Sequence, residues 1–318
     1  MKIKKLMLTI VLSAMLSGCN QSSDVRSKAF IKEIGVDCTD IQSVTLRIFD
    51  SDETISGSGR TLLSAVENCE NSQSRNFFSG HLEVFASSPL NMGNNLLTLL
   101  QNNRISPSCY VLCIPENAAG FIKNKGGSLA ELIKSNGRNG IILPQTISDV
   151  INDLLESDQK AAVPTQKDGR FTMAVISPHK LIGTLSEEES KGLCWLHGNV
   201  SDVYLPIEYD NVRTDFYIRK SSTKIKAQKN GDKIDISIQI KINGSSEENI
   251  QNIDTEKEQI GKYISSLCSK TIAKTVVGMK ADLFGIEKAI NSANISHGKT
   301  WEELIPLLNF SYEIKISQ

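Results

Sequence analysis

The clearest hydrophobic pattern in the chain is a strict alternation near residue 240. Every second position is an isoleucine and polar residues stand between them; the isoleucines are Ile234, Ile236, Ile238, Ile240 and Ile242. Since successive side chains of a β-strand point to opposite faces, this pattern predicts a strand with one buried and one solvated face. The preceding sequence KNGD, residues 229–232, predicts the turn of a hairpin.

The last third of the chain groups its strands before its helices. YLPIEY and TDFYIRK are further strand-like stretches, and FSYEIKI predicts a final strand. A long helix is expected from Thr255 to about residue 283, because a threonine followed three residues later by glutamate forms a capping box. TWEEL starts a second helix. This order predicts an α+β domain over residues 200–318, with an antiparallel sheet and a long helix.

Residues 28–157 instead alternate between strand-like and helix-like patterns. Strands are expected at 29–38, 43–49, 81–87 and 108–115, and helices at 60–71, at 94–103, from 128 onward and at 145–157. The sequence DSDETISGSG, residues 50–59, is polar and glycine-containing, so a loop is expected there. Alternation of this kind predicts an N-terminal α/β domain.

Residues 158–199 predict a small middle domain made of a hairpin and a helix. DQKAAVPTQKDG is interpreted as a break, FTMAVI and LIGTL as a hairpin, and Ser186 with Glu189 as a second capping box at the start of a helix. The expected fold class is therefore mixed α/β and α+β, in a chain of several domains.

The first eighteen residues have the pattern of a secretory signal. Lysines at positions 2, 4 and 5 precede a largely apolar run over 6–16, which spans only about 16 Å as a helix and is too short for a bilayer core. It ends in Leu16, Ser17, Gly18 and Cys19, which is similar to the bacterial lipobox, whose cysteine thiol is lipidated before the chain is cut. We expect 1–18 to be a lipoprotein signal peptide and 19–27 to be the lipidated Cys19 with a polar tether. The alternative is an ordinary signal peptide with a chance cysteine.

Charge and hydropathy narrow the classes of function. Thirty-five basic and 36 acidic residues give the 318-residue chain a formal charge of −1, which disfavours a nucleic-acid-binding protein. No apolar run reaches the roughly 20 residues of a membrane-spanning helix. Loss of residues 1–18 would remove three lysines, leaving 32 basic against 36 acidic residues and a charge of −4. Lipid, rather than charge, would then hold the chain on a membrane.

Residues able to carry catalysis or bind a metal are scattered. No two histidines have the spacing of a helical zinc pair, and no glycine-rich phosphate loop follows a strand; the histidines are His81, His179, His197 and His297. The three glutamates at 187–189 are expected to be a solvated first helical turn rather than an acid/base cluster. We expect no metal, no cofactor and no enzymatic activity.

Six cysteines follow Cys19, and none forms a C-x-x-C pair; they are Cys38, Cys69, Cys109, Cys113, Cys194 and Cys268. Cys109 and Cys113 lie about 13 Å apart along one predicted strand, too far for a disulfide between them. They are expected to act as small apolar residues, while a disulfide elsewhere remains open. Trp195 is expected in the core, and Trp301 stands at a helix start, where a half-exposed place at an interface is an alternative.

Several stretches together resemble the Ger(x)C family, the lipoprotein C subunits of nutrient germinant receptors in endospore-forming bacteria. They are AFIKEIGVD, GRTLLSAVENCENSQSRNFFSGHLEVF, KLIGTLSEEESKGLCWLHG and ADLFGIEKAI with TWEELIP and a terminal strand. With the lipobox, they cover most of the chain in the order of the family, although residues 200–250 carry no distinctive match.

The resemblance implies a multi-domain mixed fold on the outer face of the cytoplasmic membrane or spore inner membrane. It also implies assembly with two integral membrane subunits, and a role in nutrient-triggered spore germination without catalysis. Whether this subunit binds the nutrient itself stays open. The alternative from another class is a lipoprotein solute-binding component of a transporter, which would share the lipobox but usually has two similar α/β lobes.

Overall fold

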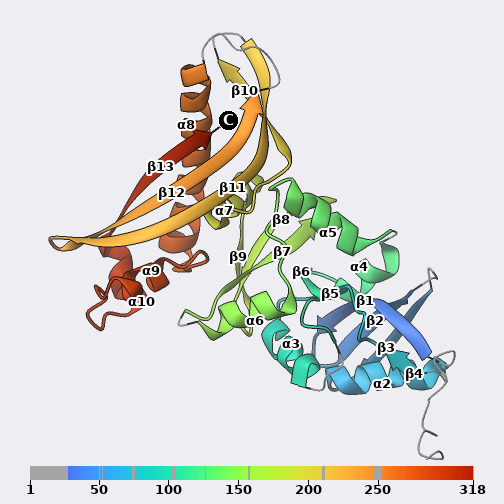
Figure 1. Ribbon diagram of the computed structural model, residues 1–318. Helices are drawn as coiled ribbons and strands as arrows, with labels where there is room; N and C mark the ends of the chain where they lie inside the picture. Colours follow the sequence, from blue (N-terminus) through green and yellow to red (C-terminus); the bar gives the residue numbers. More distant parts are fainter. Residues whose placement is uncertain are drawn as a thin grey trace, which may run out of the picture.

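The structure is a computed structural model that describes residues 28–49, 51, 53–73, 76–101, 105–125, 127–156, 158–209, 212–246 and 253–317. Two sheets organise these residues, a larger one with strands within residues 28–184 and a four-stranded one with strands within residues 203–317 (Figure 1). Helices and strands mix in both parts, so the expected mixed fold class is confirmed.

Nine strands form the larger sheet within the described residues. Their spatial order is β3-β2-β1-β5-β6-β7-β8-β9, with β4 also paired to β1. Strands β1, β5, β6 and β7 run parallel, while β2 and β3 at one edge and β8 and β9 at the other are added antiparallel. The bounds are β1 (Lys28–Cys38), β2 (Gln42–Ile48), β3 (Thr54–Gly59), β4 (Asn76–Phe78), β5 (Val84–Ser87), β6 (Tyr110–Cys113), β7 (Ala161–Lys167), β8 (Arg170–Ile176) and β9 (Leu181–Thr184).

Helices cover both faces of this sheet (Figure 1). They are α2 (Leu62–Gln73), α3 (Met92–Gln101), α4 (Ala118–Asn124), α5 (Leu129–Arg138) and α6 (Ile147–Leu155). Apolar side chains of α2, α3 and α6 form one core with one face, and those of α4 and α5 join a second core on the other face. This two-sided cover explains why the central strands are apolar throughout.

A bulge in β1 changes which residues face each core. The pairing of β1 with β2 shifts between Ile31 and Glu33. As a result Ile31 and Ile34, which ordinary alternation would place on opposite faces, both belong to the core beneath α2 and α3. Glu33 and Gly35 therefore face α4 and α5, and a Cβ on Gly35 would lie only 2.4 Å from the carbonyl oxygen of Ala118.

The four-stranded sheet has the order β10-β11-β12-β13 and is curved around one long helix (Figure 1). The alternating isoleucines of β12 are buried and belong to one core with the apolar side of α8. The elements are α7 (Glu187–His197), β10 (Val203–Tyr209), β11 (Val212–Asn230), β12 (Lys233–Ser246), α8 (Ile253–Ile272), a π-helical segment (Ala273–Gly278), α9 (Ile286–Ser292), α10 (Trp301–Leu304), a 3-10 turn (Ile305–Leu307) and β13 (Leu308–Ser317).

Helix α7 joins the two sheets. Ser190 accepts a hydrogen bond from the β8 amide of Met173 at 3.0 Å, and Thr271 of α8 donates to the carbonyl of Glu189 at 2.8 Å. Gly192 allows the two helices to approach, because a Cβ there would lie 2.1 Å from the Thr271 hydroxyl. The second core consequently runs without a break from the larger sheet through α7 to α8 and β12.

Several local predictions were wrong. Residues 54–59 form strand β3, not a loop, and the glycines there admit α2: a Cβ on Gly57 would lie 2.6 Å from the sulfur of Cys69. The segment interpreted as a break contains β7, whose first five residues are buried despite Pro164. The long helix ends at Gly278, before the predicted residue 283. The C-terminal sheet is mixed, since β13 returns through the intervening helices to pair parallel with β12.

The predicted middle domain does not coincide with a break in the sheet. Strands β7, β8 and β9, within residues 158–199, are hydrogen-bonded members of the larger sheet. The proposed domain boundaries after residues 27, 157 and 199 stay predictions. None of the helices in the described residues is both long and apolar enough to cross a membrane.

Candidate functional site

The lipobox, Leu16 to Cys19, lies outside the described residues, and its lipidation stays a prediction. The first described residue is Lys28, nine positions after Cys19. Lys28 begins β1 and also lines a cavity, so the predicted tether leads directly to the rim of that cavity.

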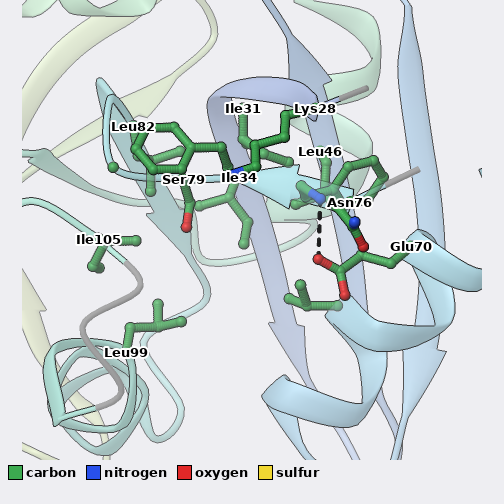
Figure 2. A pocket seen from close by; sticks show the side chains of 14 residues that line it. Lys28, Ile31, Ile34, Leu46, Glu70, Asn76, Ser79, Leu82, Leu99 and Ile105 are labelled. Atoms are coloured by element: carbon green, nitrogen blue, oxygen red, sulfur yellow. Dashed lines mark hydrogen bonds between the residues drawn. The ribbon is translucent and has the colours of Figure 1, made fainter. Parts of the chain in front are cut away.

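A cavity of about 590 Å³ lies between the larger sheet and helices α2 and α3 (Figure 2). Its deep wall is aliphatic, and the side chains there are almost fully buried; they are Ile31, Ile34, Leu46, Leu82, Leu99 and Ile105. Figure 2 shows Leu99 and Ile105 on the side of the cavity away from Glu70. The size and the apolar lining are those of ligand sites in proteins.

The bulge in β1 creates much of this wall. It turns Ile31 to the same face as Ile34, so both side chains point beneath the helices. Short strand β4 pairs with the first three residues of β1 and brings Phe77 and Phe78 to the rim. Sequence reasoning expected the strand but not the bulge, and therefore did not find the cavity.

Polar groups gather at the rim rather than in the depth. A carboxylate oxygen of Glu70 accepts a hydrogen bond from the backbone amide of Phe77 at 3.1 Å, which ties α2 to β4. Lys28 places its ammonium group 5.9 Å from the ring centre of Phe78. Asn76 and Ser79 complete the polar rim.

An aromatic cluster stands beside Lys28. The rings of Phe30 and Phe78 meet edge-to-face at 5.4 Å, and His81 lies 5.6 Å from Phe78 and 6.3 Å from Phe30. Phe78 is 37% exposed, so this apolar surface reaches solvent. His81, which the sequence places at a strand start, is thus part of an aromatic contact.

A second cavity, of about 630 Å³, is acidic and lies between α6, α7 and the segment before α9. The carboxylate of Asp282 accepts four backbone amide hydrogen bonds, from Phe284 to Glu287, and so caps α9. Burial, followed by the negative charge of neighbouring carboxylates with Asp149 first, raises the pKa of Asp153 to about 7. No group of three metal-ligating side chains occurs among the described residues.

The described cysteines, the tryptophans and two of the glutamates singled out in the sequence lie in the packed interior or in ion pairs at the surface. All six described cysteines are buried and free, and burial raises the pKa of Cys113 and of Cys194 to about 12. Trp195 is buried as expected. Trp301 is buried too, with its indole N–H donating to the carbonyl of Lys280 at 3.0 Å, so the half-exposed alternative is wrong. Glu187 and Glu188 pair with Arg170 and Lys270 at the surface.

The other histidines are also apart from one another. Asn94 contacts His179 at 3.5 Å, His197 contacts the carbonyl of Leu283 at 2.7 Å, and Lys229 contacts His297 at 3.4 Å. No two of the four share a contact in the described part of the chain that would assemble an acid/base pair.

These features define a mixed two-sheet protein with an apolar cavity near its predicted anchor. The model described as "Spore germination protein N-terminal domain" matches residues 21–167, and the model described as "Spore germination B3/ GerAC like, C-terminal" matches residues 172–317. The chain therefore belongs to the GerAC-like family of spore germination proteins, and the resemblance found in the sequence is confirmed.

A solved structure supports the same fold. The crystal structure of the GerBC protein is 18% identical to this chain, covers 90% of it and 97% of its own length, and superposes with a TM-score of 0.60. No curated protein matches the sequence. Membership of the family implies a role in spore germination.

Proposed function

We propose that this chain is a lipid-anchored accessory subunit of a membrane germinant receptor and takes part in nutrient-triggered spore germination. The observation that carries the proposal is the match of both family models across residues 21–167 and 172–317, together with the lipobox that precedes them. Its partners would be two integral membrane subunits of the receptor. Its location would be the outer face of the cytoplasmic membrane or of the spore inner membrane.

The mechanism would be positional rather than catalytic. Acyl chains on Cys19 would confine both sheets to the plane of the membrane, which raises their effective concentration near the partner subunits. The scattered histidines and the buried thiols supply no nucleophile with an adjacent base among the described residues. In this proposal the two sheets supply contact surface to the partner subunits.

The transporter alternative fits the fold less well. A solute-binding component would need two similar lobes around a ligand. Here the larger sheet has helices on both faces, whereas the four-stranded sheet has its buried face against α8 (Figure 1). One core also continues through α7 between the two parts.

The test compares spores that carry Cys19→Ala with spores that carry Ser17→Ala, which keeps a small residue before the cysteine. We expect Cys19→Ala to remove the protein from the membrane fraction and to reduce nutrient-triggered dipicolinate release to the level of spores lacking the gene. Ser17→Ala should match the wild type in both readouts. Release triggered by dodecylamine serves as the control for intact spores. A fully responsive Cys19→Ala spore with membrane-bound protein would contradict the anchoring.

A further inference from the structure

We propose that the cavity beneath α2 and α3 binds one acyl chain of a membrane lipid, with the acidic head of that lipid beside Lys28. The proposal rests on the proposed lipid anchor for access to the bilayer. The binding itself follows from the cavity, and nothing in the match to the family assigns a ligand to it.

The depth of the cavity favours an aliphatic occupant. Ile34, Leu82 and Leu99 are at most 4% exposed, yet their side chains border about 590 Å³ of space that protein atoms leave unfilled. Protein interiors pack closely, and unfilled apolar space forfeits dispersion contacts. Water is a poor occupant of the depth, because a buried water needs two to four polar partners and the polar groups of this cavity stand at its rim.

The rim fits a head group with negative charge. The carboxylate of Glu70 is turned to the backbone amide of Phe77 at 3.1 Å, whereas the Lys28 ammonium lies at the mouth over the Phe78 ring. Lysine and exposed aromatic rings are the combination that proteins place at a membrane–water interface. Phe30, Phe78 and His81 supply the aromatic part of that combination here.

The proposed anchor would lead the chain to a bilayer, and the composition of the tether offers little to an apolar cavity. Lys28 lies nine positions after Cys19, so a lipidated Cys19 would hold the mouth within about 30 Å of the membrane. The tether over 20–27, NQSSDVRS, has Val25 as its one aliphatic side chain. A bilayer lipid is therefore the nearest source of a long apolar group.

The test uses the unlipidated chain from Asn20 onward, which contains every described residue. The fluorescent fatty acid cis-parinaric acid is titrated into it and then displaced by palmitate. We expect saturable binding at one site. Val66→Trp, which fills the cavity from α2, should weaken binding at least tenfold. Leu63→Trp is the matched control, because Leu63 is also half-buried on α2 but does not line the cavity.

Two further arms examine the head group and the source of the lipid. Lys28→Gln should weaken the binding of palmitate several-fold and leave that of the neutral alcohol hexadecanol unchanged. Vesicles of phosphatidylglycerol should displace the probe. Displacement by palmitate without displacement by vesicles would overturn the bilayer as the source.

Equal binding by wild type and Val66→Trp, with thermal unfolding showing that both are folded, would overturn the proposal. Displacement of the probe by small amino acids, at the same concentrations at which palmitate displaces it, would also overturn the proposal. These results leave the proposed anchoring untouched, because the assay uses a chain without Cys19; a failure of anchoring would appear instead in the membrane fraction of Cys19→Ala spores.

Discussion

Glu33 and Arg47 form an ion pair that is buried between the larger sheet and the helices over it. The Arg47 Nε atom donates to the Glu33 carboxylate at 3.1 Å. The side chain of Glu33 is 0% exposed and that of Arg47 is 6% exposed. Glu33 also accepts from the amide of Leu129 at the start of α5, and Arg47 donates to the carbonyls of Ile122 and Lys125 at the end of α4. The pair therefore fastens β1 and β2 to both helices.

Removal of one partner should be strongly destabilising. Arg47→Met leaves the Glu33 carboxylate buried without its cation and leaves two helix-end carbonyls without a donor, which costs about 3 kcal/mol of unfolding free energy. The measurement is urea unfolding at pH 7. Lys134→Ala, which breaks the exposed pair with Glu131, is the control and should leave the urea midpoint unchanged.

The double variant of Arg47→Met with Glu33→Gln separates charge from packing. Because the neutral amide removes the unpaired buried charge, it should recover part of the loss caused by Arg47→Met alone. A double variant less stable than Arg47→Met would contradict the importance of that charge.

Helix α7 ends at Gly198, which packs against β11. A Cβ atom at this position would collide with backbone atoms of β11. The Gly198 φ of 68° is left-handed, and a Cβ would lie 2.5 Å from the backbone nitrogen of Thr223. Gly198→Ala should therefore destabilise the protein by about 2 kcal/mol or more. Gly169→Ala is the matched control, because its φ is 78° and nothing lies within 4 Å of its Cβ position. We expect about 1 kcal/mol there by urea unfolding, so equal losses would argue against the close approach.

The isoleucine strand shows what periodicity predicts well. The alternation over 234–242 specified both the strand and its buried face, and the structure has those isoleucines at 0–5% exposure. The capping boxes of Ser186 with Glu189 and of Thr300 with Glu303 formed for the same reason, because they are local interactions complete within one turn. The predicted box at Thr255 was wrong, since α8 begins at Ile253 and Thr255 lies inside it.

Features that depend on distant contacts were not predictable in this way. Strand β3 is a polar, glycine-containing edge strand, and α2 packs directly over Gly57, where a side chain would not fit. This packing depends on a separate element, so the local sequence pattern does not predict the strand. The bulge in β1 turns Ile31 to the same face as Ile34, and it alone places both side chains at the cavity. Trp301 is buried because the Lys280 carbonyl, far along the chain, receives its indole hydrogen bond.

The buried thiols should be inert while the protein is folded. The thiolate is the reactive form, and burial raises the pKa of Cys69 to about 11 and that of Cys268 to about 12. With the chain from Asn20 onward, we expect no labelling by Ellman's reagent at pH 8 in the time that glutathione reacts completely. In guanidinium chloride all six should react. Labelling of a single site in the folded protein would point to local opening around that cysteine.

Asp153 should make stability fall as pH rises from about 4 to about 7. Its pKa of about 7 in the folded protein, against an ordinary 3.8, means that the folded form keeps a proton that the unfolded chain has released. The benefit is complete below pH 4 and is lost as the folded carboxyl ionises. Asp153→Asn should thus raise the melting temperature at pH 8 by about 2 °C and change the melting temperature little at pH 4. The gain at pH 8 corresponds to about 1 kcal/mol of unfolding free energy, after allowance for the partial exposure of Asp153. Asp232→Asn, at an exposed hairpin turn, is the control; the same gain there, or a gain for Asp153→Asn that does not vary with pH, would contradict the assignment.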